Sequence, residues 1–217
     1  MKIITIIGAR PQIIKAAAIS RAIHTHFKDQ ITELIVHTGQ HYDDNMSAIF
    51  FTEMGIPTAN YNLSVGSGNH GAQTAKMMEG IETILLKERP DALLVYGDTN
   101  STLAGALAAA KIHIPVVHIE AGLRSYNKSM PEEINRMVTD AITDIFYTTS
   151  EVANDNLRKL GHDESKIRYV GNTMIDTLLK NMPRFKKSKS WDDFSLKEKG
   201  YFVMTLHRPA NVDEEVQ

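Results

Sequence analysis

Ionisable side chains are concentrated in residues 118–136, HIEAGLRSYNKSMPEEINR, which follow the apolar, β-branched run at 112–117. The stretch carries three carboxylates, three permanent cations and a histidine. Such a density of charge directly after a buried strand is typical of two different structures. It indicates either an active site at the end of the strand or a solvated loop followed by the first turn of a helix.

The glutamate pair in this stretch favours the structural interpretation when spacing alone is considered. Glu132 and Glu133 follow Pro131, which places them in a first helical turn, where carboxylates interact favourably with the helix dipole. Glu132 can also pair with Arg136, four residues later on the same helix face. Asp98 can likewise be structural, because it directly precedes a predicted helix and can serve as its cap.

Other chemically useful side chains follow the carboxyl ends of predicted strands. If the strands are parallel, these ends meet at one edge of the sheet, and ligands of open α/β sheets bind there. The residues concerned are Arg10 and Lys15 after 2–8, Gln40 and His41 after 31–39, Asp98 at the end of 92–98, Glu120 at the end of 116–120, and His207 in 201–209. Their expected convergence is the main reason to predict a site from the residues alone.

The residue types in this set suit proton transfer on a neutral substrate that carries a phosphate leaving group. A cation near a helix N-terminus is suited to a pyrophosphate. Three carboxylates in one pocket cannot all stay ionised at low cost, because they repel one another. One of them is therefore expected to act as a general acid beside a general base.

Several common ligand motifs are absent from the sequence. The nine histidines are scattered, without HExxH or a comparable spacing, so we expect no metal site. The segment GARP at 8–11 is not GxGxxG, and no acidic residue ends the second predicted strand. There is neither a P-loop nor a GxSxG elbow. We therefore expect no cofactor.

Strand-like and helix-like segments alternate along most of the chain, which predicts βαβ units and a doubly wound, mostly parallel α/β sheet. The predicted strands are 2–8, 31–39, 92–98, 116–120, 144–149, 167–172 and 201–209. The predicted helices are 11–27, 43–54, one through Ala75 and Leu85 that stops before Pro90, 100–111, 132–142 and 150–160.

The end of the chain has a different character from the rest. Residues from Asn181 onward are polar and charged, as in a connecting segment or a surface helix, and a strand then begins near residue 201. A single strand cannot cover its own apolar side chains, so it needs further elements to pack against. We therefore predict an N-terminal Rossmann-like domain over 1–168 and an incomplete start of a second domain over 169–217.

The composition is that of a soluble globular protein. Of 217 residues, 42% are hydrophobic and 23% charged, and the net charge of −2 gives no basic excess for nucleic acid. The chain contains no cysteine and no apolar run long enough for a signal peptide or a membrane span. A cytoplasmic protein without nucleic-acid or membrane partners is the expectation.

Six motifs in order carry a resemblance to a known family. They are GARPQIIKAA, VYGDTNSTLAGALAA, HIEAGLRS, MPEEINR, YVGNTMID and TLHRP. Together they resemble the bacterial non-hydrolysing UDP-N-acetylglucosamine 2-epimerases, over essentially the whole chain. The resemblance implies the N-terminal half of a GT-B-type fold of two Rossmann-like domains. It also implies that most of the second domain, with the part that holds uridine, is missing here.

The resemblance further implies a mechanism, in which UDP is eliminated to give a 2-acetamidoglucal and is then added back. It assigns Asp98, Glu120 and Glu132 to proton transfer at C2 and to support of the sugar, and Arg10 and His207 to the diphosphate. Lys15, Gln40, His41 and Arg136 are the remaining candidates for substrate binding. The implied partner is a UDP-sugar, and we expect a homodimer.

One departure from the family leaves the substrate open. Family members with an allosteric UDP-sugar site carry Gln-His-x-Gln and a later arginine, whereas Asp43 replaces the second glutamine here and 64–71 contains no arginine. This favours the subgroup that acts on modified sugars such as UDP-2,3-diacetamido-glucuronic acid. The sequence is also compatible with a GT-B glycosyltransferase and with a non-catalytic binding or dimerising domain. We predict that the 217-residue chain alone is inactive.

Overall fold

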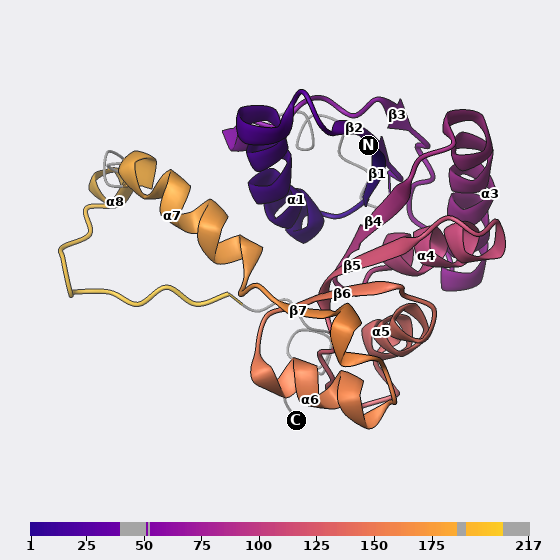
Figure 1. Ribbon diagram of the computed structural model, residues 1–217. Coiled ribbons are helices and arrows are strands. Elements are labelled where there is room, and N and C mark those ends of the chain that lie inside the picture. The colour runs from indigo at the N-terminus through magenta and orange to yellow at the C-terminus, as the bar shows by residue number, and fades with distance from the viewer. Residues whose placement is uncertain (40–50, 52, 186–189, 206–217) are drawn as a thin grey trace. The chain divides into compact units, whose positions relative to one another are not determined.

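The computed structural model describes residues 1–39, 51, 53–185 and 190–205 as an α/β protein (Figure 1). The chain divides into two compact units, Met1–Leu179 and Lys180–Gln217. The strands are β1 Lys2–Ile7, β2 Thr32–His37, β3 Tyr61–Asn62, β4 Ala92–Tyr96, β5 Val116–Ala121, β6 Ile145–Thr148 and β7 Ile167–Tyr169. The helices are α1 Arg10–Ala22, the π-helix η1 Ile23–Phe27, α3 His70–Glu88, α4 Asn100–Lys111, α5 Pro131–Ala141, α6 Glu151–Lys159, the 3₁₀ helix η2 Glu164–Lys166, α7 Thr173–Phe185 and α8 Ser190–Asp193.

The seven strands form one sheet in the order β3-β2-β1-β4-β5-β6-β7, and all paired neighbours are parallel. The chain runs outward from β1 to β2 and β3, and then from β4 to β7 in the opposite direction. The strand order therefore reverses between β1 and β4, which is the switch point where open α/β sheets bind ligands.

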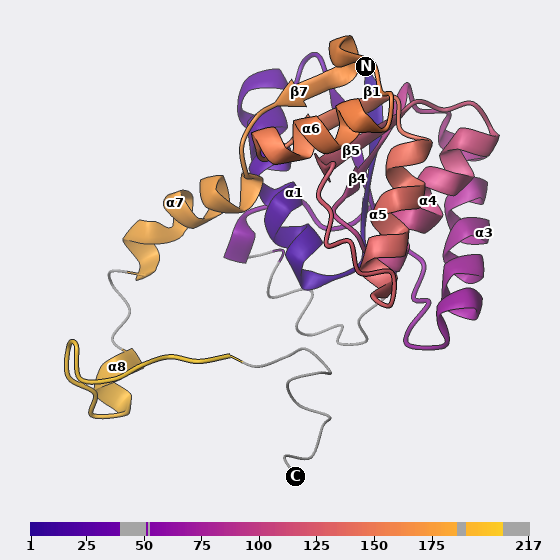
Figure 2. The same cartoon turned by 90° about the horizontal axis from the view of Figure 1, so that it is seen from below.

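Two hydrophobic clusters cover the two faces of the sheet. The first joins β1, β2, β4 and β5 to α1, and the second joins the same strands to α3 and α4. Figures 1 and 2 show α1 on one side of the sheet and α3, α4 and α5 on the other. Helix α4 approaches closely because its buried side chains are small. A Cβ atom on its Gly105 would lie 3.2 Å from Ile6 and Val95.

The structure confirms the predicted fold class, and most predicted elements agree with it to within a few residues. The predicted helix 100–111 coincides with α4. The predicted helix 11–27 is instead an α-helix that continues as the π-helix η1. The short strand β3 and helix α7 were not predicted. The predicted helix 43–54 lies mostly outside the described residues.

The prediction of a strand at 201–209 is wrong for the part that the structure describes. Residues 201–205 belong to no regular element, and residues 206–209 lie outside the described part of the chain. The side chains of Phe202, Val203 and Met204 are almost fully exposed. A strand is stable only when its backbone pairs with a neighbour and its apolar side chains are covered, and this segment has neither.

The boundary predicted between residues 168 and 169 stays a prediction. The last strand of the sheet ends at Tyr169, and the first compact unit continues to Leu179. None of the helices in the described part of the chain combines the length and the apolar composition needed to cross a membrane.

Candidate functional site

An ion pair joins helix α1 to the carboxyl end of β5. The Lys15 Nζ atom lies 2.9 Å from Glu120 Oε2, and the two side chains are only 8% and 17% exposed. Glu120 has a φ of +69°, and the pairing of β5 with β6 shifts register between Ile119 and Ala121. A bulge of this kind re-aims a side chain, and positive φ is unusual for a residue with a Cβ atom. The strand is therefore distorted at the residue predicted to do chemistry.

Gly97 lies between this ion pair and the end of β4. An added Cβ atom would stand 2.9 Å from Lys15 Nζ, and the φ of Gly97 is +62°. Its N–H donates to the carbonyl of Ile119 over 2.9 Å, which links the ends of β4 and β5. Only glycine can adopt this positive φ and also leave room for Lys15 Nζ without strain.

A second ion pair joins the loop after β4 to helix α5. Arg136 donates through Nη2 to Asp98 Oδ2, and through Nη1 to Glu133 Oε2 at 3.1 Å. Asn135 donates to the carbonyl oxygen of Asp98 at 2.8 Å. Helix α5 thus holds Asp98 by its backbone and by its carboxylate.

The predicted pairing of Glu132 with Arg136 is wrong, because Arg136 turns toward Asp98 and Glu133 instead. The side chain of Glu132 is exposed and makes no hydrogen bond or ion pair within the part of the chain that the structure describes. Asp98, which follows β4, lies close enough to α5 for its carboxylate to bind Arg136 in place of Glu132, the neighbour four residues away on the helix.

Glu133 is a structural residue. Its side chain is 1% exposed. Its carboxylate accepts hydrogen bonds from Ser125 N at 2.8 Å, Ser125 Oγ at 2.9 Å and Tyr126 N at 3.2 Å. Burial alone raises the pKa of Glu133, but these hydrogen bonds and the one from Arg136 outweigh it, so the pKa lies below the ordinary value. The adjacent glutamates therefore differ: Glu133 fastens the loop after β5, while Glu132 faces solvent.

The charges at this edge are arranged in pairs, which differs from the expected cluster of mutually repelling carboxylates. Glu120 faces Lys15, and Asp98 faces Arg136. Each of these two carboxylates, which were expected to repel each other, thus faces a different cation, and Arg136 also binds Glu133. Arg10 begins α1 and is exposed at this edge of the sheet.

Three predicted site residues, Gln40, His41 and His207, lie outside the described residues. The structure thus brings together Lys15, Glu120, Asp98 and Arg136 in two ion pairs on either side of Gly97, and it places Arg10 and Glu132 at exposed helix starts.

Gln12 is a buried residue at this edge that the sequence did not reveal. Its Oε1 accepts from Gly8 N at 2.8 Å and Ala9 N at 3.1 Å, and its Nε2 donates to Tyr96 O and to Thr102 Oγ1, both at 3.0 Å. One side chain thereby links the ends of β1 and β4 to α4. The sequence gives little signal for it, because the buried face of α1 also carries the polar residues Lys15 and Ser20.

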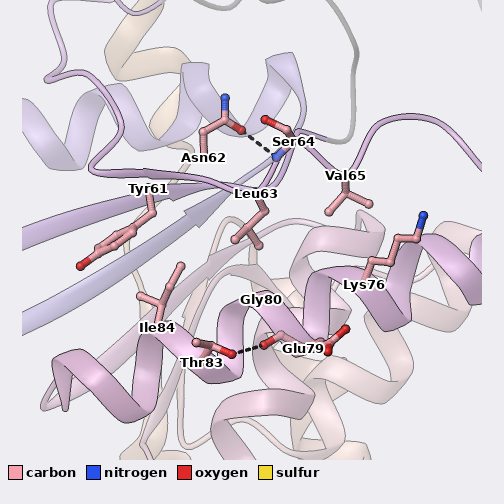
Figure 3. A pocket seen from close by; sticks show the side chains of 10 residues that line it. All are labelled: Tyr61, Asn62, Leu63, Ser64, Val65, Lys76, Glu79, Gly80, Thr83 and Ile84. Atoms are coloured by element: carbon pink, nitrogen blue, oxygen red, sulfur yellow. Dashed lines mark hydrogen bonds between the residues drawn. The ribbon is translucent and has the colours of Figure 1, made fainter.

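Two surface hollows of about 540 Å³ each are lined by residues other than Lys15, Glu120, Asp98 and Arg136. Figure 3 shows the first, between β3 and α3, where Leu63 reaches down to Gly80. A Cβ atom on Gly80 would lie 2.8 Å from Leu63 Cδ2, so glycine permits this close contact. The second hollow is lined by Arg124, Lys128 and Glu133 among others. In the described part of the chain, no group of three or more potential ligands is arranged to hold a metal ion.

The parallel sheet places the chain in the class of Rossmann-like α/β proteins. In this class, ligands bind at the carboxyl ends of the strands, where the charged side chains lie here. The family model described as UDP-N-acetylglucosamine 2-epimerase matches residues 24–217. The chain belongs to the UDP-N-acetylglucosamine 2-epimerase family, as its motifs predicted.

Individual relatives agree with this assignment. A UDP-N-acetylglucosamine 2-epimerase homolog of Methanococcus maripaludis is 53% identical over 98% of the chain and 59% of the relative. The UDP-2,3-diacetamido-2,3-dideoxy-D-glucuronate 2-epimerase of Pseudomonas aeruginosa is 50% identical over 100% of the chain and 60% of the relative. A crystal structure of Methanocaldococcus jannaschii UDP-GlcNAc 2-epimerase in complex with UDP-GlcNAc and UDP is 48% identical. It matches with a TM-score of 0.89 over 99% of the chain and 59% of that structure. The chain thus spans about three fifths of the length of these relatives.

Proposed function

We propose that the full-length protein interconverts UDP-N-acetylglucosamine and UDP-N-acetylmannosamine for surface polysaccharide synthesis. The observation that carries this proposal is that Asp98 and Glu120 both lie next to Gly97, each paired with a different cation. Two carboxylates at neighbouring strand ends suit a reaction that removes a proton from C2 and later returns one to the opposite face.

The proposed reaction proceeds in two balanced steps. A carboxylate takes the C2 proton, the electron pair of that bond forms the C1–C2 double bond, and UDP leaves C1 with the pair of the broken C1–O bond. The reverse step returns a proton to the other face of C2 while UDP adds again to C1. Asp98, Glu120 and Glu132 are assigned to proton transfer and to support of the sugar, and Arg10 and His207 to the diphosphate.

Within this site, Lys15 and Arg136 orient the two paired carboxylates. Lys15 holds Glu120 at 2.9 Å, and Arg136 holds Asp98 from α5. Glu132 lies at the exposed first turn of α5 and has no competing partner among the described residues, which leaves its carboxylate available to a substrate. Gln40 and His41 remain candidates for substrate binding.

A modified sugar is the second candidate substrate. The Pseudomonas aeruginosa relative, 50% identical, is named for UDP-2,3-diacetamido-2,3-dideoxy-D-glucuronate. The replacement of a glutamine by Asp43 and the lack of arginine in 64–71 also favour this subgroup.

Incubation of the full-length protein with each nucleotide sugar, followed by chromatographic separation of the epimers, tests both candidates. Conversion of UDP-N-acetylglucosamine supports the first, and conversion of only the diacetamido sugar supports the second. Release of UDP that requires an acceptor sugar, without any epimer, would instead identify a glycosyltransferase.

The 217-residue chain alone is proposed to be inactive, because it spans about three fifths of its relatives. Epimer formed by this polypeptide would contradict that. We also expect the full-length protein to be a homodimer, which sedimentation equilibrium would test.

A further inference from the structure

A buried His–Asp pair that the proposed reaction does not use is hydrogen bonded to the segments of the site. The side chains of His118 on β5 and Asp140 on α5 are both 0% exposed. His118 Nδ1 lies 2.8 Å from Asp140 Oδ1, and its Nε2 lies 2.8 Å from the carbonyl oxygen of Gly97. The imidazole thus connects helix α5 to the turn between the two ion pairs.

Asp140 has the hydrogen-bond partners of an ionised carboxylate. Its Oδ2 accepts from Arg124 Nη1 at 2.6 Å and from Gly122 N at 3.2 Å. Burial by itself raises the pKa of Asp140, but the hydrogen bond and charge of His118, together with Arg124, outweigh this and lower the pKa below its ordinary value. Arg124 and Gly122 are both hydrogen-bond donors, so a hydrogen on Asp140 Oδ2 would find no acceptor in either of them.

The orientation of the His118 ring follows from its two partners. A carbonyl oxygen only accepts, so Nε2 carries a hydrogen that it donates to Gly97. A second hydrogen bond joins Nδ1 to Asp140 Oδ1 over 2.8 Å. The ring is therefore fixed in orientation by a hydrogen bond at each of its nitrogens.

His118 and Asp140 are hydrogen bonded to the two chain segments that carry Asp98 and Glu120. Gly97 precedes Asp98 and donates its own N–H to Ile119, which precedes Glu120. Gly122, two residues after Glu120, donates to Asp140. We propose that His118 and Asp140 are positioning residues, which clamp the Gly97 carbonyl and hold Asp98 and Glu120 at the spacing that proton transfer at C2 requires. This inference rests on the proposed function.

Nuclear magnetic resonance of the ¹⁵N-histidine-labelled chain tests the clamp without any substrate. His118→Gln assigns the His118 ring signals. The Nε2 hydrogen of His118 is expected to exchange slowly with water, because it is buried and bonded to the Gly97 carbonyl, and Asp140→Asn is expected to speed this exchange, because the ring loses the carboxylate that orients it. Asp144→Asn is the matched control, since it removes a carboxylate that accepts from Val116 N at 2.9 Å at the opposite end of β5. A His118 Nε2 hydrogen that exchanges rapidly with water in the wild-type chain would overturn the inference.

Kinetics of the full-length protein test the positioning role. Asp140→Asn is expected to lower the rate of C2 exchange at saturating substrate by about 10- to 100-fold, with KM changed by less than about twofold, because misplaced catalytic groups lose rate. Asp144→Asn should retain the wild-type rate. If Asp140→Asn does not fold, His118→Gln should retain more activity than His118→Ala, because its amide can still donate to Gly97. Wild-type exchange with an unchanged Asp140→Asn rate, or equal rates for the two His118 variants, would refute the positioning role. No exchange by the wild type would refute the proposed function and leave the ring measurement intact.

Discussion

Replacement of Glu133 by glutamine, with Glu132→Gln as its neighbour control, tests the division of roles in the glutamate pair. The two residues are adjacent on the first turn of α5, but only Glu133 is buried and fully hydrogen bonded. An amide at this position offers one acceptor in place of two. When its oxygen replaces Oε2 and accepts from Ser125, its NH₂ group faces Tyr126 N, which now donates to Oε1 at 3.2 Å.

The magnitude follows from these contacts. A buried donor without an acceptor costs about 1–3 kcal/mol, and loss of the charge weakens the remaining bonds from Ser125 and Arg136. Glu133→Gln is therefore expected to destabilise the chain by about 2–4 kcal/mol, or about 5–15 °C in Tm for a protein of this size. Glu132→Gln removes no contact and is expected to change the stability by less than about 0.5 kcal/mol.

The stability difference between the wild type and Glu133→Gln is expected to depend on pH, in a direction set by the pKa of Glu133. The pKa of Glu133 is lowered on folding, so its contribution is fully present above the unfolded pKa of about 4.3 and is lost as the pH falls through the folded value. Urea denaturation followed by circular dichroism should show the largest difference between wild type and Glu133→Gln near neutral pH. The difference should shrink below about pH 4.

Equal stability of the wild type and Glu133→Gln at pH 7 would refute the reasoning. So would a Glu132→Gln variant that is as unstable as Glu133→Gln, because the structural role would then not be confined to the buried residue.

Three further predictions concern the same unit. Gly122→Ala places a Cβ atom 2.5 Å from the Ala153 carbonyl at a φ of +78°, whereas Gly161→Ala at φ +86° meets nothing within 4 Å. Thermal unfolding should therefore show a cost of about 1–2 kcal/mol for Gly161→Ala and at least about 1 kcal/mol more for Gly122→Ala; equal costs would contradict the clash. Ser150→Ala removes the cap that accepts from Ala153 N at 3.3 Å, and should lower the stability by about 1 kcal/mol in urea titrations, with no change arguing against the cap. Lys15→Met leaves Glu120 without its cation 2.9 Å away, and in the full-length protein it should reduce epimer formation at least about tenfold; wild-type activity would exclude Lys15 from the site.

The sequence allowed the sheet and its carboxyl edge to be predicted, because both depend on local patterns. The apolar runs that become β1, β4 and β5 end at Gly8, Gly97 and Glu120, and parallel pairing brings such ends together. The expectation that Asp98 can cap the helix at 100–111 is wrong, because the cap is its neighbour Thr99, whose Oγ1 accepts from Thr102 N at 3.4 Å. The family, with its GT-B-type fold, is confirmed as well.

The pairing of charges could not be predicted, because it depends on tertiary approach. Local spacing favoured Glu132 with Arg136, but Asp98 arrives from a strand end 38 residues away along the chain. His118 and Asp140 are separated by 22 residues, and neither pattern nor spacing indicates that they meet. The backbone distortion at Glu120 is equally hidden, since it falls at the end of β5, where only Ala121 follows to reveal a change in alternation.

The roles assigned to Asp98, Glu120, Glu132, Arg10 and His207 stay predictions, and hydrogen exchange at C2 tests them most directly. The full-length protein is incubated in D₂O with UDP-N-acetylglucosamine and, separately, with the diacetamido sugar, and the C2 proton is followed by nuclear magnetic resonance. We predict that the C2 proton of at least one sugar is replaced by deuterium as its epimer forms, and that Glu132→Gln slows this exchange while the protein stays folded. Epimer that retains its C2 proton, or no exchange with either sugar, would contradict the account.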